Sequence, residues 1–482
     1  MKKYYMFDRR LLNPQGMENV RLLVSGPRKD QRNNPLFGQD KPWEIRIDNG
    51  YPNVLYDEVQ KLYHCYYTLF TDDKDTEGST LDERLHRPYR PRTDRIPSLA
   101  YARSRDGIHW EKPSLGLVEW RGSKENNLLL LYAHGTGVML DQHETDQQKR
   151  YKLVTKVDIP GRGAHMAVGF SPDGVHWTEP IPWPKYNPPA DSHNLPFWNE
   201  DEGCYMLLSR IWKDGIRITT ISRSDDFLNW DMPQETLRGM GFEDQIYSMP
   251  AWYQEGVYLG LASLIHEGDR REDDFDCVDC QLTWSADGEK FDFVAMGQPV
   301  LPRGKGRYPD GEFDNSCIYA SPPVLGEDGR LYVYYMGGNG RHTNFRESAL
   351  GRAVWEKDKF AAYVPVREEE DSVLTTNTME FERPEIYILA EELEEGKDSF
   401  IEASIHPVWT EEPFEGFEKS RCRITREGKW YRVCWDQKES PVERGCIRLR
   451  TKNMKIWAVR GEFHLFGHRL WEGADPENEG QI

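Results

Sequence analysis

Five aspartates stand at similar points in the first two thirds of the chain, each at the opening of a segment that leads into an apolar, often tyrosine-rich strand. They are Asp48, Asp141, Asp191, Asp244 and Asp314. If the five openings converge, they crowd carboxylates into one partly dry pocket, where burial and like charge raise the pKa of at least one of them. A protonated carboxyl beside an ionised one forms a general acid and a general base. The pattern therefore predicts acid–base catalysis where the openings meet, with Asp48, Asp141, Asp191 and Asp244 as the catalytic candidates.

Other polar and aromatic residues near the openings are candidates for binding a substrate. They are His193, Asp314, Arg341, His342, Trp43 and Tyr247. His193 and Glu243 also rival Asp191 and Asp244 as the proton donor. Each candidate has a structural alternative, because a lone histidine is more often a packed structural residue and an aspartate before Asn-Gly, as at Asp48, is often only a turn residue.

One phrase recurs four times and predicts the elements that bring the aspartates together. Ser-x-Asp-Gly-x-x-Trp begins at Ser104 and Ser171, a copy ending in Phe begins at Ser285, and a variant with Phe in place of Gly begins at Ser224. The Asp-Gly pair closes a tight hairpin turn, and the aromatic residue packs over it. A repeat of this length with strand-like runs between its copies is typical of a β-propeller, and five openings predict five blades around a central pocket.

The pattern changes after residue 366. An acidic linker over residues 367–371 is followed by short strand-like segments with turns between them, which predict an antiparallel β-sandwich. A chain of 482 residues is also too long for one ordinary core. We therefore predict an all-β protein of two domains, a five-bladed propeller over residues 1–366 that holds the pocket and a β-sandwich over residues 367–482.

Charge and cysteine usage exclude several functions. The net charge of −19 argues against nucleic acid or an anionic membrane as a partner, since both attract a basic face. No apolar run is long enough to cross a bilayer, and the first ten residues lack the apolar core of a signal peptide, so we expect a cytoplasmic protein. The eight cysteines, including the isolated pair Cys277 and Cys280, look like scattered thiols and predict neither a metal site nor a cofactor. The oligomeric state stays open.

A five-bladed propeller followed by a sandwich resembles the glycoside hydrolases of families 32 and 43. The resemblance implies a carbohydrate substrate, a furanoside or a short oligosaccharide, whose glycosidic bond is hydrolysed in the central pocket. It also implies three carboxylates from the first three blades, with Asp48 as nucleophile or base and Asp141 as the stabiliser of the transition state. The third, the general acid, is a glutamate in those families, whereas this chain has Asp191 there. Relatives in family 117 use a histidine as the acid, which keeps His193 among the candidates.

Two alternatives accompany this prediction. Similar five-bladed folds include glycoside phosphorylases, which need a basic cluster for phosphate, and Arg303, Arg341 and His342 are the candidates for such a cluster. The third possibility is a propeller that binds glycans without cleaving them, because it has lost its acid. The replacement of glutamate by Asp191 favours this third interpretation.

Overall fold

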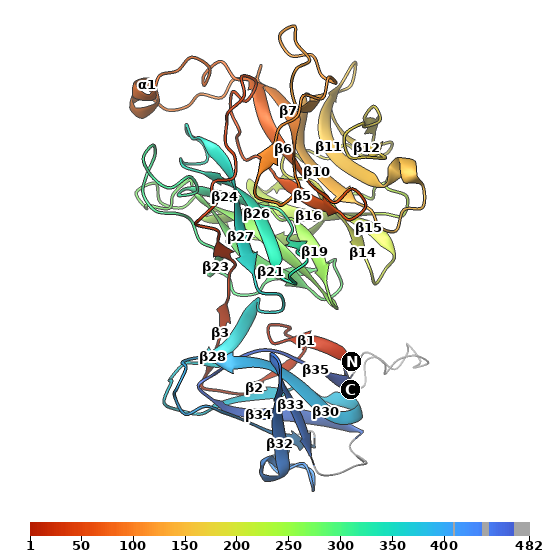
Figure 1. Ribbon diagram of the computed structural model, residues 1–482, viewed down its shortest axis with the longest axis vertical. Coiled ribbons are helices and arrows are strands. Elements are labelled where there is room, and N and C mark those ends of the chain that lie inside the picture. The colour runs from red at the N-terminus through yellow and green to blue at the C-terminus, as the bar shows by residue number, and fades with distance from the viewer. Residues whose placement is uncertain (408–409, 436–442, 467–482) are drawn as a thin grey trace. The chain divides into compact units, whose positions relative to one another are not determined.

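The computed structural model describes residues 1–407, 410–435 and 443–466 of the chain. These residues are mostly β, with one short helix among them, α1 (Leu81–His86), and two 3-10 turns, η1 (Gln147–Lys149) and η2 (Lys419–Arg421). Two compact units are formed, one by Gly26–Glu356 and the other by Met1–Ser25 together with the chain from Lys357 onward (Figure 1). None of the helices in the described part of the chain has the length and apolar character needed to span a bilayer.

The unit Gly26–Glu356 is built from five successive groups of mainly antiparallel strands, and the fourth and fifth groups are joined in one eleven-stranded sheet. The first is β5 (Asn53–Asp57), β6 (Leu62–Asp72), β7 (Ile96–Ser104), β8 (Trp110–Glu111) and β9 (Leu128–Leu131), and the second is β10 (Ala133–Leu140), β11 (Tyr151–Ile159), β12 (Gly163–Ser171) and β13 (Ile181–Pro182). The third is β14 (Leu195–Asn199), β15 (Cys204–Lys213), β16 (Ile216–Ser224) and β17 (Gln234–Arg238). The fourth is β18 (Asp244–Ser248), β19 (Ala251–Gln254), β20 (Val257–His266), β21 (Val278–Ser285), β22 (Phe291–Phe293) and β23 (Pro299–Leu301). The fifth is β24 (Cys317–Ala320), β25 (Val324–Leu325), β26 (Leu331–Gly338), β27 (Ser348–Trp355) and β4 (Arg28–Lys29), which comes from the start of the unit.

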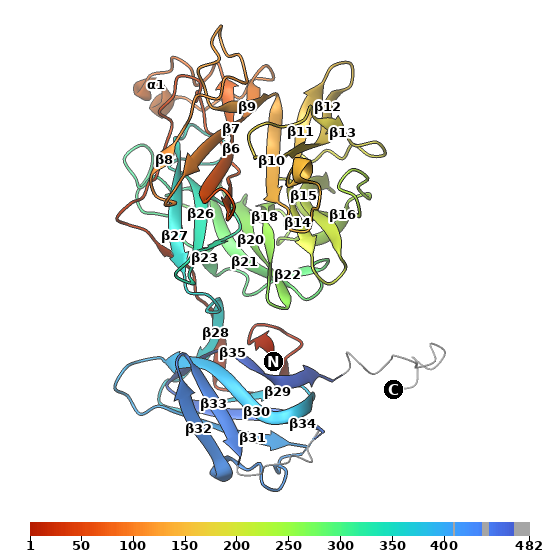
Figure 2. The same ribbon diagram turned by 45° about the vertical axis from the view of Figure 1, so that its right-hand side comes forward.

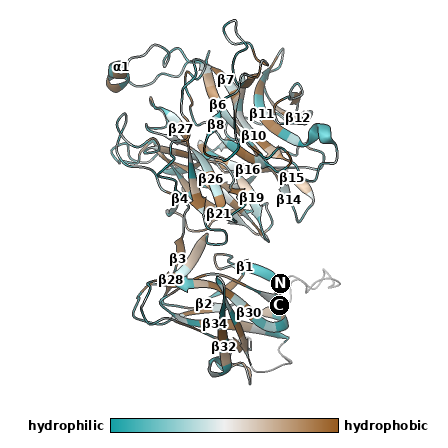
Figure 3. Ribbon diagram, in the orientation of Figure 1, coloured by the Kyte–Doolittle hydropathy of each residue, from teal (hydrophilic) through white to brown (hydrophobic). Residues whose placement is uncertain are grey.

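The long middle strands of these groups are buried on both faces. Almost every residue of β6, β20 and β21 is buried. Such strands form near-continuous apolar runs because the sheets pack against one another on both sides. Figure 3 shows the same contrast, with hydrophobic residues along the strands and hydrophilic residues in the long loops. The loop that carries α1 projects away from the sheets (Figures 1 and 2).

The recurrent serine–aspartate phrase forms the predicted hairpin turn. In its first copy, the Gly107 N–H donates to Ser104 Oγ at 2.9 Å and the Ile108 N–H donates to Asp106 Oδ1 at 2.8 Å. The second and fourth copies make the same two contacts. Gly107 has a φ of 70°, and a Cβ at this position would lie 2.2 Å from the Tyr334 hydroxyl. The turn therefore needs glycine both for its backbone conformation and for close packing against a strand of the fifth group.

Each group contacts the next, and the fifth contacts the first. These contacts join, in chain order, Asn53 with Thr136, Thr136 with Asn194, Ser192 with Tyr247, Val278 with Cys317, and Ser321 with Val54. The contacts among the first four groups, and that of Ser321 with Val54, involve the first strand of a group or the residues that flank it. The fourth group meets the fifth differently, because Val278 begins β21, which β20 separates from the first strand β18. The five groups therefore form a closed cycle of contacts.

The other unit contains a single sheet of eleven strands and its own apolar core. Its main path is β2-β29-β34-β30-β35-β28-β3, with β1, β31, β32 and β33 paired at the side. The strands are β1 (Lys2–Tyr5), β2 (Leu12–Glu18), β3 (Val20–Val24), β28 (Ala361–Pro365), β29 (Ser372–Thr376), β30 (Met379–Glu392), β31 (Phe400–His406), β32 (Cys422–Glu427), β33 (Trp430–Trp435), β34 (Arg444–Lys452) and β35 (Met454–Leu465). Only Asn19 separates β2 from β3, the two ends of the path, so the sheet must bend round. One bent sheet thus takes the place of the two sheets of the predicted sandwich.

The first 25 residues belong to this second unit, which differs from the predicted division at residue 366. β1 pairs with β35 through Lys2 and Gly461, and β3 pairs with β28 through Val24 and Ala361. The repeat pattern marks only the strands of the other unit. A pairing between opposite ends of the chain leaves no comparable signal in the sequence.

Candidate active site

The openings of the first three groups meet at His134, the second residue of β10. Asp48 lies in the segment before β5, and Asp191 lies in the segment before β14. Burial lowers the pKa of the His134 imidazole, while the negative charges of Asp191 and Asp48 act in the opposite direction. Asp48 and Asp191 therefore both act electrostatically on one imidazole.

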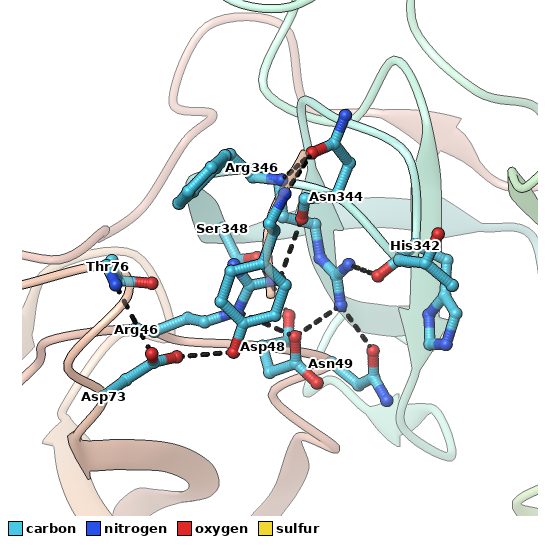
Figure 4. A network of polar contacts seen from close by, with 12 residues as sticks. Arg46, Asp48, Asn49, Asp73, Thr76, His342, Asn344, Arg346 and Ser348 are labelled. Carbon is cyan, nitrogen blue, oxygen red and sulfur yellow. Dashed lines mark hydrogen bonds and ion pairs between the residues drawn. The ribbon is translucent and has the colours of Figure 1, made fainter. Parts of the chain in front are cut away.

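Asp48 is held by two arginines (Figure 4). Its Oδ1 accepts from Arg46 Nε at 3.0 Å and from Arg346 Nη2 at 2.8 Å, and 18% of its side chain is exposed. Burial alone would raise the pKa of Asp48, but the guanidinium groups of Arg346 and Arg46 hold it well below its usual range. Asp48 is consequently ionised at every physiological pH, which suits a base or a nucleophile and not a proton donor.

The two arginines are themselves fixed by the surrounding loops. Arg346 also donates to Asn49 Oδ1 at 2.7 Å and to the carbonyl of His342. Arg46 stacks on the Tyr89 ring, with 4.0 Å between its Cζ and the ring centroid, and donates to a backbone carbonyl of the loop that follows His342. Through these contacts, loops of the first and fifth groups hold Asp48 in place (Figure 4).

The predicted histidines are buried or half-buried and neutral. His193 is buried, its Nε2 lies 2.9 Å from Asn53 Oδ1, and burial lowers its pKa to about 3. His342 has its Nδ1 2.9 Å from the Tyr319 hydroxyl, and burial together with the charge of Arg346 holds its pKa well below the usual range. Near neutral pH both imidazoles are therefore in their neutral form. Neither has the additional proton that a general acid donates.

Asp191 and Asp244 differ in their surroundings. Asp191 is 54% exposed and pairs through Oδ1 with Arg210 at 2.6 Å. Asp244 Oδ1 lies 2.6 Å from Nδ1 of His266, whose Nε2 lies 2.9 Å from Asp279 Oδ2. Burial alone would lower the pKa of His266, but its two carboxylate partners raise it to about 9. The carboxylate–imidazolium–carboxylate arrangement was not predicted, although the β18–β20 register places Asp244 opposite His266.

Asp141 does not join Asp48. It follows the last residue of β10, seven residues beyond His134, which corresponds to roughly 20 Å along a strand. Its Oδ2 accepts from the Tyr205 hydroxyl at 2.7 Å and pairs with Lys152 at 3.0 Å. The predicted opening of the second group differs from the structure, because β10 begins at Ala133 and His134, near its start, is the residue on which the charge of Asp48 acts.

Asp314 and Trp43 have structural contacts. Asp314 is buried, pairs with Lys29 at 2.6 Å and accepts from the Tyr335 hydroxyl at 2.9 Å. Trp43 donates to Asn127 Oδ1 at 2.7 Å and packs edge-on against a neighbouring tryptophan in an apolar core. Among the contacts of the described residues, none joins Asp314 or Trp43 to Asp48, Arg46 or Arg346.

Tyr247 contacts one of the predicted histidines, and Arg341 lines a cavity. The Tyr247 ring meets His342 edge to face at 4.6 Å between centroids. Arg341 stacks on Phe275 and lines a cavity of about 820 Å³ with Arg303, a second residue of the predicted phosphate cluster. His342, the third member of that cluster, is not among the residues that line this cavity, and Glu243 is exposed.

A second cavity, of about 380 Å³, is lined by Asp141, His143, Trp198 and Trp252. It also includes Asn53 and Leu55 of β5 and Leu195 and Phe197 of β14, from the first to the third residue of each strand. No cluster of three or more His, Cys, Asp or Glu side chains within the described ranges could hold a metal ion.

No protein-family model matches the chain, and no curated protein matches it. Among solved structures it is similar to a proposed glycoside hydrolase from Parabacteroides distasonis, with 16% identity and a TM-score of 0.45 over 69% of this chain and 97% of that one. It is also similar to an N-acetylgalactosamine deacetylase from F. plautii in complex with blood group B trisaccharide, with 16% identity, a TM-score of 0.44 and coverage of 70% and 96%. A thermostable family-43 glycoside hydrolase gives 13% identity, a TM-score of 0.43 and coverage of 63% and 88%. Glycoside hydrolases are thus among the structural neighbours, as the sequence resemblance leads one to expect, but TM-scores below 0.5 transfer no activity to this chain.

Proposed function

We propose that the unit Gly26–Glu356 is a five-bladed β-propeller that cleaves a glycosidic bond in a carbohydrate. The observation that carries the proposal is the half-buried carboxylate of Asp48, clamped by Arg46 and Arg346 where the openings of the first strands meet. The closed cycle of five strand groups supports the propeller. The fixed charges around Asp48 then support hydrolysis, because charged groups held beside a reacting bond stabilise the charge that develops in the transition state.

Asp48 is the residue that acts on the anomeric carbon. Both arginine contacts go to its Oδ1, which leaves Oδ2 to face that carbon or a water molecule. Direct attack retains the anomeric configuration and attack through water inverts it. Asp191 is the first candidate for the proton donor, because it shares His134 with Asp48 and has an exposed carboxylate. Asp244 and Glu243 remain the alternatives.

The test is turnover of a panel of aryl furanosides and aryl pyranosides by the full chain and by Asp48→Asn. Asparagine keeps an oxygen that accepts from both arginines but removes the charge, so we expect the fold to persist and kcat to fall about 10²–10⁴-fold. Asp106→Asn is the matched control, because its Oδ1 accepts only in a repeat turn and an amide oxygen can take its place. Its turnover should equal that of the unmodified chain.

Asp48→Ala gives a second readout. If Asp48 is the nucleophile, added azide or formate should restore cleavage in this variant by occupying the space of the missing carboxylate. Turnover indifferent to Asp48→Asn would overturn the assignment of Asp48. Carbohydrate binding without turnover of any glycoside would overturn hydrolysis and leave a binding protein.

A further inference from the structure

The cavity of about 820 Å³ is formed by loops of the fourth and fifth groups and by α1. The fourth group contributes residues before β21 and after β23, the fifth contributes the loop after β26, and α1 contributes Arg84 and Leu85. Sites that bind small molecules usually have volumes of about 300–1,000 Å³. The cavity therefore has the volume of a small-molecule site.

Four arginines line this cavity, and two of them have no hydrogen-bond or ion-pair partner in the described part of the chain. Arg84 and Arg307 each pair with a carboxylate, at 3.0 and 2.6 Å. Arg303 and Arg341 are half-buried, and within the described ranges neither guanidinium has such a pair. Their nitrogen atoms are not among the buried atoms that lack a partner, so the free donors are accessible to solvent. With 81 acidic residues against 62 basic ones, the chain has no shortage of carboxylates that could pair with them.

Both unpaired arginines are held in the cavity wall. Arg341 stacks on Phe275, with 5.6 Å between its Cζ and the ring centroid, and this contact uses none of its N–H donors. Arg303 is followed by Gly304, whose N–H donates to a backbone carbonyl at 3.0 Å. Cys277 lines the same cavity; burial raises the pKa of its thiol, while the charges of Arg303 and Arg341 act in the opposite direction. The two arginines thus act electrostatically on one side chain of the wall.

The acidic side chains of the lining differ in the same way. Asp273 pairs with Arg307 at 2.6 Å, and Asp279 Oδ2 lies 2.9 Å from Nε2 of His266. Asp274 also lines the cavity, is half-buried and has no ion pair within the described ranges. A guanidinium with free donors matches the two oxygens of a carboxylate or phosphate group, whereas a free carboxylate accepts from hydroxyl groups and repels an anion. The free groups together suit a ligand that combines an oxyanion with hydroxyl groups.

The cavity is adjacent to the candidate active site but separate from it. The carbonyl of Arg341 accepts from Arg346 Nη1 at 3.2 Å, and the carbonyl of Asn344 accepts from Arg46 Nη2 at 2.9 Å (Figure 4). Arg341 and Asn344 both line the cavity, whereas Asp48 does not. One loop therefore contacts both the cavity and the two arginines that hold Asp48.

We infer that Arg303, Arg341 and Asp274 form a binding site for a sugar that carries an oxyanion. The oxyanion, which is the carboxylate of a sugar acid or the phosphate of a sugar phosphate, pairs with the free guanidinium donors, and Asp274 accepts from the hydroxyl groups. The inference goes beyond the proposed hydrolysis and does not depend on it, because binding in this cavity needs neither Asp48 nor turnover. A neutral sugar would leave both arginines without a partner and would bind less tightly.

The test is a calorimetric titration of the full chain with glucuronate, glucose 6-phosphate, glucose and inorganic phosphate. We expect one of the two charged sugars to bind at least about tenfold more tightly than glucose, a difference of about 1.4 kcal/mol. Arg303→Gln and Arg341→Gln should each lose most of this preference, and Asp274→Asn should narrow the difference between the charged sugar and inorganic phosphate. Arg330→Gln is the matched control, because Arg330 pairs with a surface carboxylate at 2.8 Å outside the cavity. Since Arg303 and Arg341 have no ion pair to lose, their glutamine variants should keep the urea midpoint of the unmodified chain.

The outcomes separate the two sources of the oxyanion. A preference for glucuronate that both glutamine variants lose assigns the site to a carboxylate, and the same result with glucose 6-phosphate assigns it to a phosphate group. Equal affinity for charged sugars and glucose, or a preference that survives both glutamine variants in folded protein, overturns the inference. Inorganic phosphate that binds as tightly as the charged sugars overturns the role of Asp274. Cleavage of glycosides does not enter this test, so a failure of the hydrolase proposal leaves the site standing.

Discussion

Replacement of Arg346 by methionine tests how much the ion pair between Arg346 and Asp48 contributes to the stability of the unit Gly26–Glu356. Arg346 is 3% exposed and donates to the carboxylate of Asp48, to Asn49 and to two backbone carbonyls. Methionine keeps much of the volume but removes every donor. Breaking one partner of a buried pair costs about 3–5 kcal/mol, because the other charge stays buried. We expect a loss of this size in the free energy of unfolding of the unit Gly26–Glu356 at pH 7.

The assay is pulse proteolysis across a urea series, with the intact band of the unit as the readout. At an m-value of about 3 kcal/mol/M, the expected loss lowers the urea midpoint by about 1 M or more. Arg330→Met is the control, because Arg330 pairs with Asp328 at the surface at 2.8 Å and its loss should cost under about 1 kcal/mol. In the double variant Arg346→Met with Asp48→Asn, the two losses should fall short of additivity by about 0.5–3 kcal/mol, since one partner of the pair is already gone.

The stability difference between the unmodified chain and Arg346→Met should also depend on pH in a definite direction. The folded-state pKa of Asp48 is depressed, so its ionised form stabilises the fold above its ordinary value of about 3.9, and this contribution declines as the pH falls toward the lower folded value. The difference between the unmodified chain and Arg346→Met should therefore be largest near neutral pH and should shrink below about pH 4. A midpoint shift equal to that of Arg330→Met, or losses that add fully in the double variant, would refute the reasoning.

Three further predictions concern other parts of the chain. The pKa of His266 is raised to about 9 in the folded state, against about 6.5 when unfolded. Its contribution to stability is therefore complete below about pH 6.5 and is lost as the pH rises toward 9. The midpoint of thermal unfolding of His266→Gln should lack this decrease between about pH 6.5 and 9. Gly107→Ala should lower the unfolding free energy by about 1–3 kcal/mol more than Gly122→Ala, because both positions have positive φ but only a Cβ at Gly107 overlaps the Tyr334 hydroxyl; equal losses would contradict the packing argument. A thiol reagent should label at most three of the eight free cysteines before unfolding and all eight after it, and early labelling of a fourth would contradict the burial of the rest. The three half-buried thiols are Cys422, Cys434 and Cys446.

Most of what could be predicted about the fold follows from the repeated serine–aspartate phrase. A mostly β fold is confirmed, and the serine–aspartate phrase forms the expected turn because all of its contacts are local to five residues. The two-sheet sandwich and the boundary at residue 366 differ from the structure. Those features depend on pairings such as that of Lys2 with Gly461, across almost the full length of the chain.

The candidate site could be predicted only in part. Asp48 and Asp191 both act electrostatically on His134, and their place in one site and their roles stay predictions. Asp141 is the acidic residue that the repeat predicts for the second opening, but it follows the end of β10, whereas His134 lies near the start of that strand. The sequence does contain a signal for Arg210, since an arginine within the otherwise apolar strand Cys204–Lys213 needs a buried partner or a ligand. The convergence of Arg346 on Asp48 has no such signal, because loops of the first and fifth groups form it.

The pairing of β1 and β3 with strands beyond residue 357 sets an order for folding during synthesis. Since the unit Gly26–Glu356 lies between the two parts of the other unit, it can complete its sheets on the ribosome before the partners of β1–β3 exist. At about 5–20 residues per second, the first 25 residues wait on the order of tens of seconds with their strand edges unpaired. During that interval the nascent chain presents an unpaired β segment to chaperones or to neighbouring chains. The apolar content of β2 and β3 thus affects the yield of folded protein as well as the stability of the finished sheet.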